Sequence, residues 1–72
     1  MTLTDSLEKF LEENHLVVLA TQSAIFKGQS KLIDGNMGRV QLENVTCYSG
    51  GKEFPLNKII IKFDDIVAWG IP

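Results

Sequence analysis

The first fifteen residues carry apolar side chains at the spacing of an amphipathic helix. These apolar residues are Leu3, Leu7, Phe10 and Leu11. Such intervals place them on one helical face. A helix is therefore predicted over about residues 4–14, with Thr4 or Asp5 as its N-terminal cap and an end near Asn14 and His15. Because a helix of this length is marginal in isolation, we expect its apolar face to pack against the rest of the chain.

From residue 16 the pattern changes to the alternation that is typical of β-strands. Strands are predicted over about residues 16–21, 24–33, 38–48, 57–63 and 66–70, with a loop over residues 49–53. Gly28 inside the second strand predicts a sharp bend or a close backbone approach. In the third strand the apolar residues change phase near Glu43 and Asn44, which predicts a bulge or a strong bend.

The connections between these strands are too short for the crossovers that parallel strands need. We therefore predict a mainly β fold, with an N-terminal helix followed by a five-stranded, strongly bent antiparallel small barrel. The whole chain, residues 1–72, is expected to form a single domain.

The last two predicted strands have apolar residues on both faces. Ile59, Ile61 and Phe63 share one face, whereas Ile60 stands on the other face between two lysines. One helix cannot cover both faces of a five-stranded sheet, so edge-to-edge pairing between subunits is the better explanation. A chain of 72 residues without a disulfide also has a small core, and oligomerisation is a common way to stabilise one. The expected subunit interface consists of Ile59, Ile60, Ile61, Ile66, Val67 and Trp69.

The composition is that of an ordinary globular protein, with 44% hydrophobic and 22% charged residues. The formal net charge is −2, and the acidity lies in residues 1–15, which sum to −3, whereas residues 16–72 sum to +1. Neither part has the basic excess of a non-specific DNA-binding protein. A nucleic-acid site therefore has to be local, built by a few side chains or repeated by symmetry.

The residues that several other protein classes require are missing. A single Cys47 and a single His15 exclude an intrachain disulfide and a metal cluster, and Cys47 is expected to be a small buried apolar residue. There is no phosphate-binding glycine loop and no nucleophile elbow, and Asp64 with Asp65 is typical of a solvated turn. We therefore expect no catalytic residue, no cofactor, no small-molecule substrate and no enzymatic activity.

The sequence also gives an expectation of location. No apolar run approaches the ~20 residues that cross a bilayer. The first residues, Met1 to Asp5, lack the basic start and apolar stretch of a signal peptide. We expect a cytoplasmic protein without a membrane partner.

Two segments resemble the motifs of the Sm-like (Lsm) family. Leu16-x-Val18 leading to Phe26-x-Gly28, and then Asp34-x-x-Met37, is similar to the first Sm motif. The segment from Ile59 to Val67 is similar to the second motif, whose usual core is Ile-Arg-Gly-x-x-Ile. Gly28-Gln29 followed by Ile33-Asp34 resembles the bacterial host-factor (Hfq) branch. The chain departs from the motifs at Ser23, at Gly38 in place of an asparagine, and at Lys62-Phe63 in place of Arg-Gly.

The resemblance implies a ring of about five to seven subunits, in which the fourth strand of one subunit pairs with the fifth of the next. Rings of this family bind single-stranded U- or A-rich RNA near the pore. In such a site Lys62 would contact a phosphate or a base edge, Phe63 would stack on a base, and Asn36 or Asp34 would read one. The RNA-binding residues implied by position are Asp34, Asn36, Met37, Lys62, Phe63 and Asp64.

Two other interpretations remain open. A ring that has kept the fold but acts as a protein scaffold is favoured by Gly38, by Lys62 and by the net negative charge. A monomeric SH3-like peptide-binding domain fits the number of strands but leaves Ile60 and Trp69 unexplained. Strand alternation also places Phe63 on the same face as Ile59 and Ile61. Phe63 is therefore either a core residue or a residue that stacks on a base.

Overall fold

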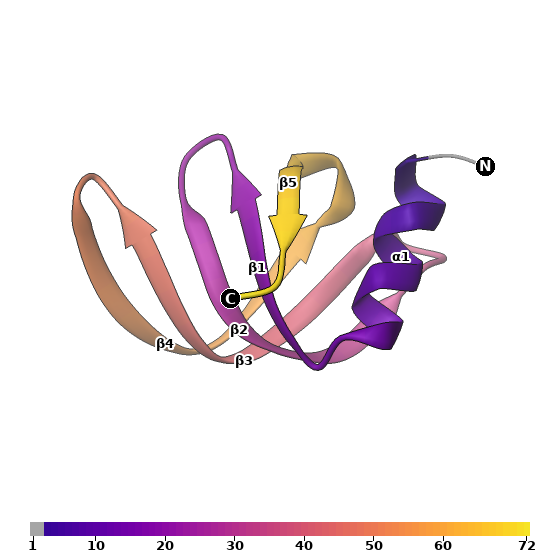
Figure 1. The fold of residues 1–72 in the computed structure, drawn as a ribbon, viewed down its shortest axis with the longest axis horizontal. Coiled ribbons are helices and arrows are strands. Elements are labelled where there is room, and N and C mark those ends of the chain that lie inside the picture. The colour runs from indigo at the N-terminus through magenta and orange to yellow at the C-terminus, as the bar shows by residue number, and fades with distance from the viewer. Residues whose placement is uncertain (1–2) are drawn as a thin grey trace.

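The computed structural model describes residues 3–72 as one helix followed by five strands (Figure 1). The helix α1 spans Leu3–Glu13 and the strands are β1 Leu16–Thr21, β2 Ile25–Asp34, β3 Arg39–Ser49, β4 Lys52–Lys62 and β5 Ile66–Gly70. A single 3-10 turn, Phe63–Asp65, separates β4 from β5 where the sequence predicts a break. Residues 1 and 2 and the side chains of Leu3 and Thr4 lie outside the described part of the chain. The predictions that rest on them, the apolar contact of Leu3 and the absence of a signal peptide, therefore have no structural counterpart.

The helix α1 forms through its apolar face and ends where the sequence predicts. Leu7 and Leu11 are buried, and the ring of Phe10 packs against Trp69 with 6.5 Å between centroids. Asn14 closes the C-terminal end, since both its backbone amide and its side-chain amide donate to the carbonyl of Phe10. The helix begins at Leu3, one residue before the predicted start. The predicted cap is wrong, because Thr4 and Asp5 lie within the first turn. An acidic Asp5 is still favourable there through the helix dipole.

The five strands form one antiparallel sheet in the order β4-β3-β2-β1-β5. The sheet is strongly curved, and β5 lies across its open side near the end of β4 (Figure 1). In this order β4 and β5 are the two edge strands. Each pairs with one neighbour on its inner side, and within the described residues its outer side has no partner strand. The predicted antiparallel, bent five-stranded architecture is confirmed.

The bend in the sheet has a local cause at Gly28 and Asn44. The register of β2 and β3 shifts between Lys27 and Gln29, and Asn44 takes a positive φ of 52°. A Cβ on Gly28 would lie 3.0 Å from a methyl group of Val45, so only glycine allows β3 to approach so closely. This is the bulge that the change of apolar phase predicts, and it lets both halves of β3 face the core.

The strand β4 begins earlier than predicted. It starts at Lys52, opposite Ser49, so that residues 52 and 53 belong to a strand and not to the predicted loop, and residues 54–56 precede the predicted strand start at 57. Gly50 and Gly51 both have positive φ, at 60° and 76°, which is the geometry of a tight two-residue hairpin turn. Because the turn is so tight, the pairing of β3 with β4 continues as far as Ser49 and Lys52. Pro55 lies within β4, as is typical of an edge strand.

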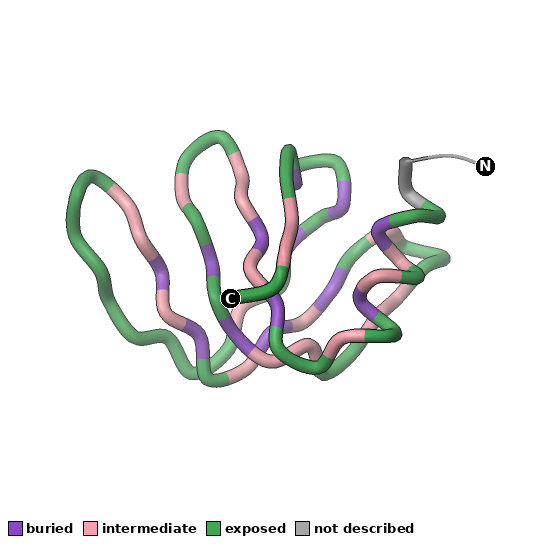
Figure 2. The backbone as a smooth tube through the Cα atoms, in the orientation of Figure 1, coloured by how far each residue is buried: buried purple, intermediate pink, exposed green. Residues whose placement is uncertain are grey.

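The core lies between the curved sheet and α1. Buried positions alternate with exposed ones along the strands, and the first half of β4 is exposed throughout (Figure 2). Cys47 is buried, as predicted. The core consists of Leu7, Leu11, Val17, Leu19, Phe26, Val40, Leu42, Val45, Cys47, Ile61, Phe63 and Ile66.

Residues 3–72 contain neither a membrane-spanning helix nor a cluster of metal-binding side chains. No helix there has the length and apolar character of a membrane span. Within the same residues, no three His, Cys, Asp or Glu side chains come together in a way that could hold a metal ion.

Candidate functional site

The two segments that resemble Sm motifs meet at one end of the sheet. The backbone amide of Phe63 donates a hydrogen bond of 2.8 Å to the carbonyl of Gly38, which joins the loop after β2 to the turn after β4. The strand ends are also paired, since Arg39 is the register partner of both Asp34 and Lys62. The structure thus brings the two motif loops together at one site, which we call the loop site. It consists of five of the predicted residues, Asp34, Asn36, Met37, Lys62 and Asp64, and of Arg39, which pairs with Lys62.

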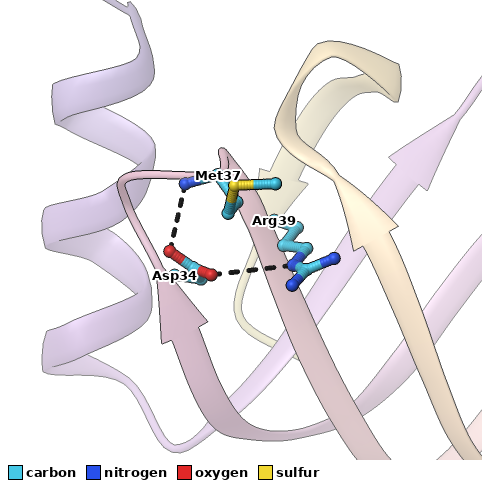
Figure 3. Close-up of polar contacts among 3 residues, drawn as sticks. All are labelled: Asp34, Met37 and Arg39. Carbon is cyan, nitrogen blue, oxygen red and sulfur yellow. Dashed lines mark hydrogen bonds and ion pairs between the residues drawn. The ribbon is translucent and has the colours of Figure 1, made fainter.

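Asp34 organises the loop after β2. One carboxylate oxygen accepts a hydrogen bond of 3.0 Å from the backbone amide of Met37, and the other lies 3.7 Å from Nε of Arg39 (Figure 3). An ionised carboxylate can only accept hydrogen bonds, so these two contacts leave fewer acceptor positions for a ligand. The structure gives Asp34 a role in shaping the loop, beside the predicted role in reading a base.

Asn36 and Met37 are the accessible side chains of this loop. Asn36 is exposed and offers an amide that both donates and accepts hydrogen bonds. The side chain of Met37 is 66% exposed, and its flexible thioether can pack against flat apolar groups. The loop lies close to α1, since a Cβ on Gly35 would contact the carboxylate at the flexible end of the Glu8 side chain.

Phe63 does not lie in the loop site. Its side chain is only 6% exposed and belongs to the core together with Ile61 and Ile66. Alternation along β4 continues into the turn, so Phe63 points inward as Ile61 does. The predicted stacking of a base on Phe63 therefore needs correction, because a buried ring offers no face to a ligand.

Arg39 is a residue of this site that the sequence analysis missed. It is the first residue of β3 and is paired with Lys62, the last residue of β4. Both side chains are exposed. Their proximity depends on the register of β3 and β4, and only the glycine turn at residues 50–51 pointed to that register.

The charges of the loop site are mixed. Arg39 and Lys62 lie in one row with Asp34 across three strands. Asp64 and Asp65 are exposed in the 3-10 turn and line a groove of about 520 Å³ together with Val67. This groove does not include Arg39 or Lys62 in its lining. The cations and the acidic pair therefore face different surroundings.

The same groove separates the two free edges of the sheet. Ile60 on β4 and Val67 on β5 line it and are 55% and 60% exposed, so that both side chains are accessible in the single chain. Ile59 is half-buried, and Trp69 is half-buried against the helix. Ile61 and Ile66 are already buried in the core, so only their backbones remain available to a neighbour. This corrects the expectation for those two side chains.

Comparison with known proteins identifies the fold. No protein-family model and no curated protein sequence matches the chain. Solved structures do match, among them a heptameric archaeal Sm protein, with a TM-score of 0.74 and 12% identity over 89% of this chain and 97% of that chain. The SmAP1 heptamer of P. aerophilum matches with a TM-score of 0.75 and 13% identity over 93% of both chains.

A third similar structure is the Sm protein of Pyrococcus abyssii in complex with a uridine heptamer. Its TM-score is 0.69, with 18% identity over 85% of this chain and 90% of that chain. At these identities the likeness shows the fold alone. The chain therefore has the Sm fold, as its two motifs predict, whereas the finer resemblance to the host-factor branch stays a prediction.

Proposed function

We propose that this chain assembles into a homo-oligomeric ring and binds single-stranded U- or A-rich RNA at the loop site near the pore. The observation that carries the proposal is the meeting of both motif loops at one end of a sheet whose two edges are free. In this proposal the chain acts by binding and not by catalysis, and it acts on RNA in the cytoplasm.

The free edges support the ring. An edge strand with exposed apolar side chains tends to pair with another chain, and Ile60 and Val67 are such side chains on the two edges. Pairing of β4 with β5 of the next subunit covers both and closes after about five to seven copies. The similar archaeal protein and the SmAP1 protein are heptamers, which supports assembly of this kind.

The chemistry of the loop site supports RNA. Single-stranded RNA offers unpaired base edges and faces, for which the Asn36 amide and the Met37 thioether are suitable partners. Lys62 supplies a positive charge for phosphate, and ring symmetry repeats it around one axis. The Pyrococcus abyssii protein of the same fold was solved with a uridine heptamer, which supports a uridine-rich ligand.

A direct test combines mass and binding. Light scattering on the purified chain should give several times the 8.0 kDa of one subunit. Fluorescence anisotropy with short labelled oligo-U and oligo-A should show binding that weakens as salt rises. Lys62→Gln should weaken it, whereas Lys52→Gln, at the far hairpin end of β4, should not.

The alternative functions give different results in the same test. An intact ring that binds neither oligonucleotide would support the protein scaffold, which the glycine at position 38 favours because the Sm motif has an asparagine there. An 8.0 kDa species in solution would support the monomeric SH3-like domain.

A further inference from the structure

Arg39 and Lys62 form a pair of like charges on the outer face of the sheet. They are register partners in the antiparallel pair of β3 and β4. Their neighbours Val40 and Ile61 are also partners and are buried, so alternation places Arg39 and Lys62 on the opposite, solvent-facing side. Side chains of directly opposite residues begin about 5 Å apart. Two cations therefore lie side by side.

This arrangement is unfavourable for the fold on its own. Like charges directly opposite each other on two strands destabilise a sheet. Asp34 offsets only part of the repulsion, since its carboxylate lies 3.7 Å from Nε of Arg39, both side chains are well exposed, and its other oxygen accepts from Met37. The guanidinium keeps further N–H donors for another anion.

No other acidic side chain of the site is committed to these cations. Asp64 and Asp65 line the groove beside Val67, and within residues 3–72 neither forms an ion pair with Arg39 or Lys62. Glu43 accepts a hydrogen bond from Gln41 and is the register partner of Lys58, four positions along each strand from Arg39 and Lys62. The row of Asp34, Arg39 and Lys62 therefore keeps a net positive charge.

The backbone fixes the pair in place. Arg39 is the first residue of β3 and Lys62 the last of β4, and the hydrogen bond from Phe63 to Gly38 closes the ladder immediately beyond them. Two paired strands hold the backbone of the site in place, so that ligand binding orders only the two side chains. The fork of an arginine and the point charge of a lysine suit the oxygens of one phosphate group.

We propose that Arg39 and Lys62 together bind one backbone phosphate of single-stranded RNA, as a phosphate subsite of the loop site on the outer face of the sheet. Asp34 holds the guanidinium of Arg39 until the phosphate replaces it. This inference rests on the proposed RNA binding and assigns to Arg39 a contact that the Sm motifs do not contain. Each subunit of the ring contributes one such subsite.

The test is a salt titration of oligo-U binding by the assembled protein, followed by fluorescence anisotropy. Arg39→Gln should lower the affinity about tenfold, the loss typical of a hydrogen bond to a charged group. It should also reduce the slope of log affinity against log salt by about 0.7 for each contacted phosphate. Lys52→Gln removes the same charge far from the site and should change neither quantity.

A second variant separates a contact from a purely structural role. Asp34→Asn keeps an acceptor for the amide of Met37 but removes the charge that competes for Arg39. It should raise the affinity several-fold, and the gain should vanish in the double variant Asp34→Asn with Arg39→Gln, because the two residues act on each other. Arg39→Lys, which keeps the charge but loses the fork, should fall between the wild type and Arg39→Gln.

The possible failures are distinguishable. If the wild-type ring binds oligo-U but Arg39→Gln behaves like Lys52→Gln, the phosphate subsite is overturned while the proposed function stands. An equal gain from Asp34→Asn with and without Arg39 also overturns it. If the wild type binds no oligonucleotide, both proposals are overturned. Light scattering on every variant shows whether the ring is intact.

Discussion

The backbone amide of Phe63 and the carbonyl of Gly38 are joined by a hydrogen bond of 2.8 Å. This bond sets the relative position of two loops that are distant in the sequence. The acceptor belongs to a residue with a φ of 67°, the left-handed region that favours glycine. The side chain of the donor is buried in the core. The geometry of the candidate site is therefore anchored at one end by a glycine turn and at the other by core packing.

Gly38→Asn should keep the fold and strengthen RNA binding. Nothing lies within 4 Å of the position that a Cβ would take, and asparagine enters the left-handed region more readily than most residues. The new amide would stand where the Sm motif has its asparagine. Gly38→Val should instead lower the free energy of unfolding by about 1–2 kcal/mol, because a side chain strains this conformation. Urea denaturation measures the difference, and equal stability of the two variants would contradict it.

Gly28→Ala should destabilise the chain by about 1–3 kcal/mol, because a Cβ there overlaps its neighbours. The new atom would lie 3.0 Å from a methyl group of Val45 and 3.1 Å from the carbonyl oxygen of Glu43. Gly70→Ala is the matched control, since nothing lies within 4 Å of its Cβ position. Thermal denaturation of both variants gives the comparison. If Gly28→Ala proves as stable as the control, the bend does not depend on this close approach.

The bend itself shows what could be predicted from the sequence. A change of apolar phase at Glu43 and Asn44, with a glycine in the preceding strand, is a local signal, and the structure confirms it with a bulge at these positions. The start of β4 was not predicted, because polar and small residues from 49 to 53 are typical of a loop. Only the paired positive φ angles of Gly50 and Gly51 turn this segment into a tight hairpin.

The candidate site was predictable only at the residues that lie within the two motifs. The loop after β2 follows from Asp34, Gly35 and Asn36 as turn residues. The proximity of Arg39 to Lys62 depends on the register of two strands, for which the glycine turn at residues 50–51 was the only signal in the sequence. The role of Phe63 was ambiguous for another reason. It follows the last residue of a strand and begins a turn, so its side chain can either continue the inward alternation of the strand or point outward with the turn.

Ile60→Asp should prevent assembly without unfolding the subunit. The side chain is 55% exposed in the single chain, so a carboxylate there remains solvated until a neighbour covers it. In the proposed interface the charge would be buried without a partner, which costs several kcal/mol. Leu32→Asp is the matched control, because Leu32 is 61% exposed but lies on β2, away from both edges. Light scattering should give a small species for the first variant only. A full-sized ring from Ile60→Asp would place the interface elsewhere.

Phe63→Leu should leave RNA binding unchanged while lowering stability slightly. The ring is 6% exposed and packs with other core residues, so a smaller apolar side chain keeps most of its contacts at a loss of about 1 kcal/mol. Phe63→Ala should cost about 3–5 kcal/mol, a large part of the stability of so small a domain.

The leucine variant decides between the core role and the stacking role of Phe63. If a base stacked on this ring, loss of the aromatic face would cost about 1–3 kcal/mol per base and weaken oligo-U at least fivefold. Phe54→Leu, at a 44% exposed position in the outer half of β4, controls for the loss of an aromatic ring in itself. Anisotropy titrations should give the wild-type affinity for both leucine variants, whereas Lys62→Gln weakens binding. A selective loss in Phe63→Leu would mean that RNA draws this ring out of the core and that the loop site rearranges on binding.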